Sequence, residues 1–341
     1  QRKLGTIILV LAAYVGSFAQ EIDGNKLLRH LEYLSSDTLE GRKPLSKGST
    51  MAQNYLLMEL SSLPLVAPLY PDFIQPFSFE DRRSKKMVVD ARNIVAFIPG
   101  STSKKVIVVT AHYDHVGIGR PDSSGDSIYN GALDNASGSA SMFSIAKAYS
   151  KMKEKPKRTI IFLSVTAEEQ GLLGSLWYAQ NPIYPIKNTI ANINMDGAAI
   201  MGRMKDLTIT GYGHSEMDDI AAAEAKKQGR YILPDQEPEK GYFFRSDHFC
   251  FAKVGVPALY AKGSYDHREK GKEYAMKKKK EFTTTNYHQP SDQYLKGDWD
   301  LKGAVEDAQL FFNVGLRLAN EKLYPQWKEG SEFKNARELK D

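Results

Sequence analysis

The hydrophobic and polar positions of this chain follow two kinds of pattern. Short runs of β-branched and aliphatic residues are typical of strands, and the run Val106–Ala111 is continuous enough to predict a strand buried on both faces. Longer segments with apolar residues every three or four positions predict amphipathic helices. The expected strands are 93–98, 106–111, 159–165, 190–195, 207–210 and 256–260, and the expected helices are 25–34, 49–61, 137–152, 172–179, 215–228 and 300–321.

Strands and helices follow one another in turn along most of the chain. This order predicts an α/β fold, a three-layer sandwich in which helices flank a mostly parallel, mixed central sheet. In open sheets of this kind, ligands bind beyond the carboxyl ends of the strands. Polar segments that directly follow a strand are therefore the first candidates for a functional site.

The first residues have the layout of a signal peptide. Arg2 and Lys3 precede an apolar run over 4–15, and small residues follow it. The run is short for a membrane span and polar sequence comes next, so we expect no stable membrane insertion after removal of residues 1–19. We interpret 20–341 as a single catalytic domain that is secreted or periplasmic. A retained anchor or a buried first helix is the alternative.

Composition and charge narrow the class of protein. The chain has 341 residues, 42% of them hydrophobic and 26% charged, as is ordinary for a globular protein with a sizeable core. The net charge of +5 is scattered apart from Lys277–Lys280, which we interpret as a solvated loop, so no nucleic-acid partner is expected. Cys250 is the only cysteine, which rules out an internal disulfide.

Five short segments concentrate the residue types that carry chemistry. Three of them come after predicted strands, one precedes a predicted helix, and the last lies in the loop before the final helix. Strand ends of a parallel sheet converge on one edge, so these segments can share a site. They are Ala111–His115, Gly131–Gly138, Ala167–Gly171, Asn194–Gly197 and Tyr287–Asp292.

Each segment alone is a weak signal, because a single histidine, a Glu-Glu pair or an aspartate at a strand end usually has a structural role. Together they supply two histidines and three carboxylates, no cysteine, and one spare carboxylate. Nitrogen and oxygen ligands of this kind suit Zn²⁺, which keeps an open position for water in catalytic sites. Co²⁺ and Mn²⁺ are compatible with the same ligands.

Amide hydrolysis explains why this set of residues would occur together. Zinc lowers the pKa of its bound water to about 7, and two ions about 3.5–4 Å apart can share a hydroxide while polarising the scissile carbonyl. One carboxylate must bridge the two cations, and another must move a proton from water to the leaving amine. The adjacent Glu168 and Glu169 can divide metal binding and proton transfer between them. Asp114, two residues after His112, can fix the imidazole through its far ring nitrogen.

These segments together resemble the secreted two-zinc aminopeptidases of metallopeptidase family 28. Further matches are Leu39–Arg42, Asn93–Gly100, Ser246–Phe249 and Gly255–Ala258, and the resemblance covers Asp37–Glu321. It implies the zinc exopeptidase fold and a peptide substrate cleaved at its N-terminal peptide bond.

The resemblance also implies two zinc ions per chain. His112, Asp134 and Asp196 would bind one ion, and Asp134, Glu169 and His288 would bind the other, so that Asp134 bridges them. The peptide bond after the bridging aspartate is often cis in this family, which extends the expectation to Asp134–Asn135.

Roles for the remaining residues follow from the same resemblance. Glu168 would be the general base that activates a metal-bridging hydroxide and later the general acid, and Asp114 would orient His112. Tyr287 would stabilise the oxyanion, with packing alone as the alternative.

The substrate side of the site is harder to predict. We expect Asp247, His248 and Phe244 to line the substrate cleft, although a loop held by local hydrogen bonds or core packing would explain them equally well. His115 is interpreted as structural or exposed at the rim. The polar insert 120–129 is expected to fold over the rim of the site, and 265–285 is a charged insert whose role the sequence does not indicate.

Two other functions remain open. A glutaminyl cyclase of the same fold would use a single zinc ion and release ammonia, and it would need no bridging role for Asp134. A non-enzymatic binding module is the second alternative, and the presence of all five ligand positions and Glu168 argues against it.

Overall fold

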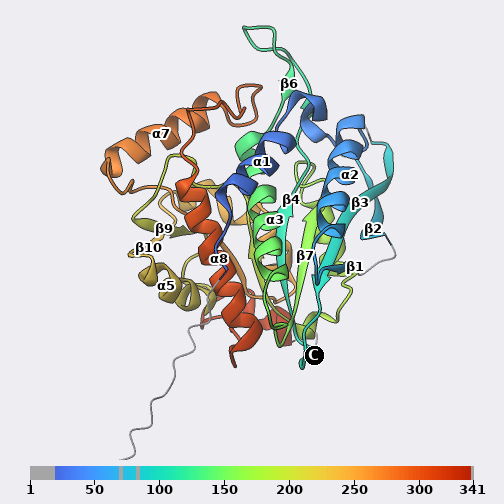
Figure 1. Cartoon of the computed structure of the whole chain (residues 1–341), viewed down its shortest axis with the longest axis vertical. Helices are drawn as coiled ribbons and strands as arrows, with labels where there is room; N and C mark the ends of the chain where they lie inside the picture. Colours follow the sequence, from blue (N-terminus) through green and yellow to red (C-terminus); the bar gives the residue numbers. More distant parts are fainter. Residues whose placement is uncertain (1–19, 69–71, 82–84, 339–341) are drawn as a thin grey trace, which may run out of the picture.

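The structure is a computed structural model that describes residues 20–68, 72–81 and 85–338 (Figure 1). The segment 1–19, interpreted above as a signal peptide, lies outside the described residues. Within the described ranges, no helix combines the length and the apolar composition that crossing a bilayer requires.

A mixed sheet of nine strands forms the centre of the described chain, in the order β1-β3-β7-β4-β8-β11-β9-β10, with β2 also paired to β3. The central strand β4 runs parallel to both β7 and β8, and β11 runs parallel to β8. On one side of this parallel group β3 pairs with β7 in antiparallel orientation, and on the other side β9 pairs with β11 in antiparallel orientation. The strands are β1 (Ala67–Pro68), β2 (Ile74–Glu80), β3 (Met87–Ile98), β4 (Val106–His112), β7 (Thr159–Val165), β8 (Thr189–Asn194), β9 (Asp206–Ile209), β10 (Tyr231–Pro234) and β11 (Ala258–Lys262), and a separate small ribbon pairs β5 (Gly117–Ile118) with β6 (Ile128–Tyr129).

Helices cover both faces of the sheet, which confirms the expected three-layer α/β sandwich. One face carries α1 (Gly24–Leu34), α2 (Lys47–Ser61), α3 (Ser137–Ser150), α5 (Met217–Lys227) and α8 (Lys302–Asn320), whose buried side chains share one core (Figure 1). The opposite face carries α4 (Leu173–Gln180) and α6 (His248–Lys253), with a core of their own. Helix α7 (Gly271–Thr285) has a single buried residue, Ala275, and takes part in neither core.

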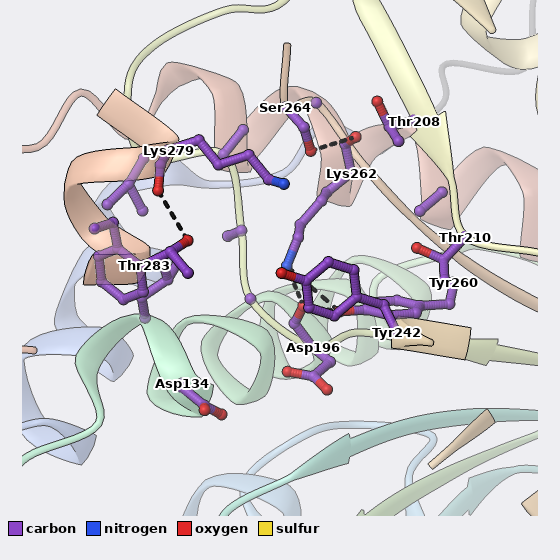
Figure 2. A pocket seen from close by; sticks show the side chains of 18 of the residues that line it. Asp134, Asp196, Thr208, Thr210, Tyr242, Tyr260, Lys262, Ser264, Lys279 and Thr283 are labelled. Atoms are coloured by element: carbon purple, nitrogen blue, oxygen red, sulfur yellow. Dashed lines mark hydrogen bonds between the residues drawn. The ribbon is translucent and has the colours of Figure 1, made fainter. Parts of the chain in front are cut away.

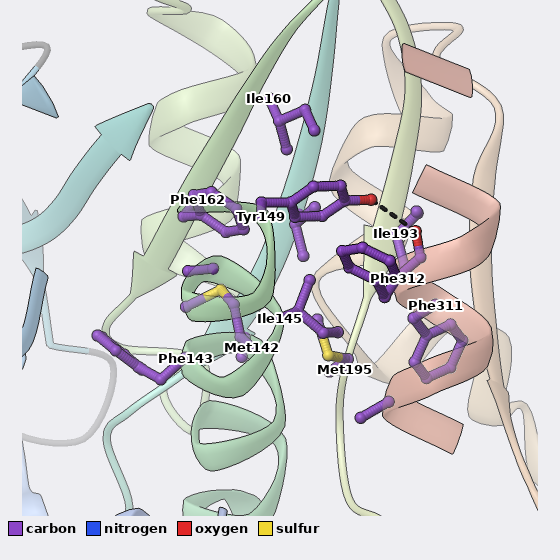
Figure 3. Close-up of a cluster of buried hydrophobic side chains, with 14 of the residues drawn as sticks. Met142, Phe143, Ile145, Tyr149, Ile160, Phe162, Ile193, Met195, Phe311 and Phe312 are labelled. Carbon is purple, nitrogen blue, oxygen red and sulfur yellow. Dashed lines mark hydrogen bonds between the residues drawn. The ribbon is translucent and has the colours of Figure 1, made fainter. Parts of the chain in front are cut away.

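The central strands β4, β7 and β8 are buried along their whole length and rich in apolar residues, because helices cover both of their faces. In β4, Val106 and Val108 pack toward α4 and α6, whereas Ile107 and Val109 pack toward the larger helical layer. On that side, Tyr149 of α3 donates a hydrogen bond of 2.6 Å to the carbonyl of Phe312 in α8 (Figure 3).

Most of the expected elements occur within a few residues of their predicted bounds. The sequence did not predict β1, β2, β10, α6, α7 or the β5–β6 ribbon as separate elements. Helix α7 falls in the segment described above as a charged insert, and it has no apolar stripe that could have revealed it. The interpretation of Lys277–Lys280 as a loop is wrong, because these residues belong to α7.

Candidate metal centre

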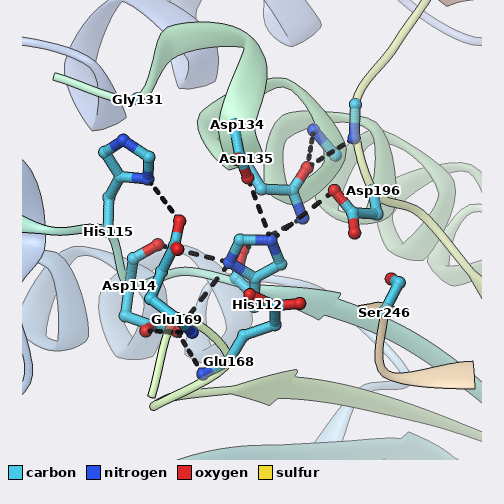
Figure 4. Close-up of polar contacts among 12 residues, drawn as sticks. His112, Asp114, His115, Gly131, Asp134, Asn135, Glu168, Glu169, Asp196 and Ser246 are labelled. Carbon is cyan, nitrogen blue, oxygen red and sulfur yellow. Dashed lines mark hydrogen bonds and ion pairs between the residues drawn. The ribbon is translucent and has the colours of Figure 1, made fainter. Parts of the chain in front are cut away.

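Polar side chains from five separate segments meet at the carboxyl ends of the central strands. Figure 4 shows those of His112, Asp134, Glu168 and Asp196. His112 is the last residue of β4, and Glu168 and Asp196 follow the ends of β7 and β8. Asp134 lies in the turn Ala132–Ala136 that enters α3, and His288 follows α7. The strand-end rule therefore places the site correctly, since parallel neighbours end at the same edge.

All five residues expected to bind metal come together there. Nε2 of His112 lies 3.3 Å from Oδ1 of Asp134 and 3.6 Å from Oδ1 of Asp196. Nε2 of His288 lies 3.1 Å from Oδ2 of Asp134 and 3.3 Å from Oε2 of Glu169. The two oxygens of Asp134 thus face two different histidines, which is the geometry of a carboxylate between two sites.

The donor set fits divalent cations. Among the described residues, Nε2 of His112 is buried and has no hydrogen-bond partner, although carboxylate oxygens surround it. A buried imidazole nitrogen and several carboxylates facing one point are ligands that zinc accepts. Two groups bring candidate ligand atoms within 4.8 Å of one another: His112, Glu168 and Asp196, and His115, Asp134, Glu169 and His288.

The charges in this cluster act strongly on one another. Burial lowers the pKa of His288, but its hydrogen bonds to Asp134 and Glu169 raise that pKa to about 10. Burial and Asp134 raise the pKa of Glu169, whereas its contacts with His115 and His288 outweigh them and lower it to about 2. Glu169 is therefore a carboxylate at neutral pH, which is the form that binds a cation.

Glu168 differs from its neighbour. Burial, together with the negative charges of Asp196, Asp247 and Glu169, raises its pKa well above the usual range for a glutamate, against the opposing effect of His112. A carboxylate with a raised pKa holds a proton more readily than an ordinary one, as a group that accepts and returns a proton must.

Asp114 holds the loop that carries both glutamates. Its carboxylate accepts hydrogen bonds from the backbone N–H groups of Glu168 (3.2 Å) and Glu169 (3.4 Å). Its Oδ1 lies 3.8 Å from Nδ1 of His112, whereas its backbone carbonyl is closer, at 3.3 Å. Asp114 therefore contacts His112 mainly through its carbonyl oxygen, while its carboxylate fixes the position of Glu168 and Glu169.

Asn135 connects three of the ligand-bearing loops. Its amide nitrogen donates to the carbonyls of Met195 (2.9 Å) and His112 (3.3 Å), and its amide oxygen accepts from the N–H of Gly197 (2.9 Å). The peptide bond between Asp134 and Asn135 is cis, as predicted.

Asp292 anchors the same turn from the other side. Its two carboxylate oxygens accept hydrogen bonds from the N–H groups of Leu133 (2.9 Å) and Asp134 (3.1 Å). Burial raises its pKa to about 6, against the stabilising effect of these two bonds. The carboxylate thereby fixes the backbone of the proposed bridging residue.

Arg42 is a buried cation directly beneath the site. Its guanidinium donates hydrogen bonds to the carbonyls of Leu34, Tyr113, Asn130 and Gly131. These bonds join the strand end that carries His112 to the loop before Asp134. Arg42 belongs to the segment Leu39–Arg42, which contributes to the family resemblance of the sequence. Nothing in the sequence indicated these contacts.

His115 is neither exposed at the rim nor remote from the site. It is completely buried, with Nδ1 located 2.7 Å from Oε1 of Glu169. Its ring also contacts that of His288, with the two centroids 5.4 Å apart. Of the two alternatives predicted for His115, the exposed position is wrong because the side chain is completely buried, whereas a structural role agrees with its contact with Glu169.

The residues expected on the substrate side have different surroundings. Tyr287 stacks on His288 with ring centroids 4.0 Å apart, and it lines the cavity beside the metal ligands. Asp247 and His248 are completely buried, and Phe244 is exposed and packs against Phe243 and Phe249. Asp247, His248 and Phe244 are not among the residues that line the cavity.

The fold is similar to solved structures of bacterial enzymes. The Legionella pneumophila LapA aminopeptidase matches with a TM-score of 0.63 and 18% identity, over 88% of this chain and 73% of that chain. An aminopeptidase from Aneurinibacillus sp. strain AM-1 matches with a TM-score of 0.63 and 14% identity, over 90% and 97%. The Bacteroides thetaiotaomicron glutaminyl cyclase bound to N-acetylhistamine gives a TM-score of 0.62 and 18% identity, over 87% and 98%. At these identities the likeness shows the fold alone.

Curated relatives are more similar in sequence over shorter stretches. A probable glutamate carboxypeptidase of Arthroderma benhamiae is 33% identical over 139 residues, which are 40% of this chain and 17% of that protein. A probable zinc metalloprotease of Pyrenophora tritici-repentis is 38% identical over 109 residues, which are 32% of this chain and 24% of that protein. The matches thus span less than a quarter of the length of these two relatives.

The family comparison covers the site itself. Residues 93–312 match the sequence profile of peptidase family M28. This range is more than half of the 341 residues and contains every residue of the metal centre described above apart from Arg42. The chain therefore belongs to peptidase family M28.

Proposed function

We propose that this protein is a zinc-dependent aminopeptidase that removes the N-terminal residue of peptides and uses two zinc ions. The observation that carries the proposal is the position of Asp134, whose two oxygens lie 3.3 Å from His112 and 3.1 Å from His288. A carboxylate placed between two imidazoles, each with a further carboxylate beside it, suits two adjacent cations better than one.

The ligands divide into two sets that share one residue. His112, Asp134 and Asp196 would hold one ion, and Asp134, Glu169 and His288 the other. When bound, the ions lower the pKa of water and polarise the scissile carbonyl. Asp114, Asn135 and Asp292 keep these side chains in place through the backbone bonds described above.

Glu168 is the proposed proton carrier. Its raised pKa and its place beside His112 and Asp196 suit a group that takes a proton from water and delivers it to the leaving amine. Tyr287 lines the same cavity, and its hydroxyl is the proposed donor to the oxyanion. The proposal includes export directed by residues 1–19 and a single catalytic domain over 20–341.

A glutaminyl cyclase is the second candidate, because a cyclase structure matches this fold about as well as the aminopeptidases do. In such an enzyme, the α-amine of an N-terminal glutamine attacks the carbonyl of its own side-chain amide, which closes the pyroglutamate ring and releases ammonia. In this chain, the arrangement of Asp134 between two histidines favours the hydrolase.

Metal analysis and substrate turnover together separate the two candidates. Purified protein would be loaded with zinc, dialysed, and assayed for bound zinc and for release of p-nitroaniline from a panel of aminoacyl-p-nitroanilides. Pyroglutamate formation from glutaminyl peptides would be measured in parallel. The aminopeptidase proposal expects about two zinc ions per chain and anilide cleavage that a chelator abolishes and zinc restores. About one zinc ion with pyroglutamate as the product would overturn it in favour of the cyclase.

A further inference from the structure

A cavity of about 260 Å³ extends from the metal centre between the sheet edge and α7. Asp134, Glu168 and Asp196 line one end of it. Figure 2 shows Asp134 and Asp196 at this end. Away from this end, the lining comes from β9, from β11 and the residues that follow it, and from α7. The cavity is thus continuous with the place where the scissile bond of a peptide would lie.

The far part of the cavity has both apolar and polar walls. Ala199, Ala261 and Phe282 contribute apolar surface, whereas Thr208 and Ser264 contribute hydroxyl groups (Figure 2). These two hydroxyls already donate hydrogen bonds, to the carboxylate of Asp206 and to the carbonyl of Lys262, respectively. The groups of this wall that remain available to an anionic ligand are therefore its cations.

The cations in this part of the cavity are not equally neutralised. Lys278 and Lys279 form ion pairs with Glu281 and Glu237, respectively. For Lys262 and Arg245, the described part of the chain contains no carboxylate in ion-pair contact, and Asp235 is the single carboxylate that lines the cavity beyond the metal end. Lys262 and Arg245 therefore have no ion-pair partner among the described residues.

Among the cations that line the cavity, Lys262 is the one that contacts the loop of the metal ligand Asp196. Its ammonium group donates a hydrogen bond of 2.8 Å to the backbone carbonyl of Asp196 and makes a longer contact of 3.5 Å with the hydroxyl of Tyr260 (Figure 2). Nζ of Lys262 is also close to Gly197, the residue after Asp196. A Cβ atom on Gly197 would come within 2.6 Å of this nitrogen. Since an ammonium group has three N–H donors, Lys262 can still bind an anionic ligand.

We propose that this cavity receives the side chain of the substrate's N-terminal residue and that Lys262 selects an acidic one, aspartate or glutamate. The inference rests on the proposed aminopeptidase function, which places the carbonyl under attack beside Asp134 and Asp196. From that point, the substrate side chain enters a space with Lys262 at its near wall. A carboxylate would pair with the ammonium group, whereas leucine or methionine would occupy the same space without neutralising it.

The test compares the kcat/KM values of glutamyl-, glutaminyl-, leucyl- and methionyl-p-nitroanilide. Glutamyl-p-nitroanilide is expected to exceed each of the other three at least tenfold, and the glutaminyl substrate controls for size. In Lys262→Met, the glutamyl value should fall at least tenfold while the leucyl value stays equal or rises. Lys226→Met, an exposed position on α5 that does not line the cavity, should leave all four values unchanged.

The possible results distinguish a failure of the proposed aminopeptidase function from a failure of the proposed acidic preference. If none of these anilides is cleaved by the zinc-loaded enzyme, the proposed function itself fails. If leucyl-p-nitroanilide is cleaved as fast as the glutamyl substrate or faster, the aminopeptidase stands and the acidic preference is refuted. An equal loss for all substrates in Lys262→Met would refute it too, because Lys262 would then only support the Asp196 loop.

The carboxylate has a second possible source, the C-terminus of a dipeptide. Anilides lack that group, so a glutamyl preference among them must come from the side chain. Cleavage of Leu-Leu that is much faster than that of Leu-Leu-amide, without any glutamyl preference, would assign the cations to the terminal carboxylate and overturn the side-chain assignment.

Discussion

Nδ1 of His115 lies 2.7 Å from Oε1 of Glu169, whereas Nε2 of His288 lies 3.3 Å from the other oxygen of that carboxylate. Both side chains are buried, so the contact is shielded from water. This close polar contact places His115 where it can orient a proposed zinc ligand, and neither of its ring nitrogens has a hydrogen-bond partner among the described residues. A contact of this kind fixes both the rotamer and the charge of the ligand.

Replacing His115 by alanine should therefore weaken metal binding. Loss of an outer contact of a metal ligand typically costs about 10–100-fold in affinity or activity. The affinity for zinc, measured by competition with a chromogenic chelator, should fall by about that factor for one of the two ions. His214→Ala, at a half-buried ring stacked on Phe243, is the control and should bind zinc as the unmodified protein does. Unchanged zinc affinity in His115→Ala would contradict the orienting role.

Glu168→Gln should remove activity without removing metal. The amide keeps the size of the side chain but cannot accept the proton, and general acid–base catalysis of this kind contributes about 10²–10⁴-fold in rate. We expect kcat to fall by that range while the zinc content per chain stays the same. Glu216→Gln, at the N-terminal end of α5, is the matched control.

The measurement also tests the assignment of Glu168. Ligand atoms of Glu168, His112 and Asp196 lie within 4.8 Å of one another, so a direct role in metal binding is geometrically available. Loss of one zinc ion in Glu168→Gln would show that Glu168 is a ligand and that another group carries the proton.

The sequence predicted the parts of this structure that depend on local pattern. The strands β4, β7 and β8 are recognisable because each is buried on both faces, and the strand-end rule then brings His112, Glu169 and Asp196 to one edge. The assignment of Asp134 and His288 depended on the family resemblance, since neither follows a strand.

The contacts that hold the site together were not predictable in the same way. Arg42 binds the carbonyl of a residue 89 positions later, and Asp292 binds the N–H of Leu133, which is 159 positions earlier. No periodicity records such pairs, because backbone groups of any residue type can be the partners. Helix α7 was missed for another reason: with Ala275 as its only buried residue, it lacks the apolar stripe on which helix prediction depends.

Arg42→Met should destabilise the fold as well as the site. The substitution leaves four buried carbonyl groups without their charged donor, and removing one side of such a buried network costs about 3–5 kcal/mol. Arg42→Lys should recover only part of this, because an ammonium group cannot reproduce the planar fork. Urea unfolding of the metal-free protein would measure the free energies. Arg29→Met, exposed on α1, should change the stability by less than about 0.5 kcal/mol. A change in the free energy of unfolding as small for Arg42→Met as for Arg29→Met would show that the hydrogen bonds of Arg42 do not stabilise the fold.

His30 should make the stability of the fold depend on pH below neutrality. The residue is buried between α1 and α3, and its Nδ1 lies 2.7 Å from the hydroxyl of Tyr55. Burial, reinforced by the charges of Arg29, Lys147 and Lys26, lowers its pKa from the ordinary 6.5 to about 4.

The sign follows from the two pKa values. Above pH 6.5 His30 is neutral in both states, so its contribution to stability is complete. Between pH 6.5 and 4 the unfolded chain binds a proton that the folded chain does not, so the free energy of unfolding decreases as the pH falls, by at most about 3 kcal/mol. Urea unfolding of the wild type and of His30→Gln from pH 7 to pH 5 would isolate this contribution, since the carboxylates of the metal centre are common to both proteins. The wild type should lose more stability on acidification than His30→Gln does, whereas equal losses would show that His30 is protonated in the folded state as readily as in the unfolded one.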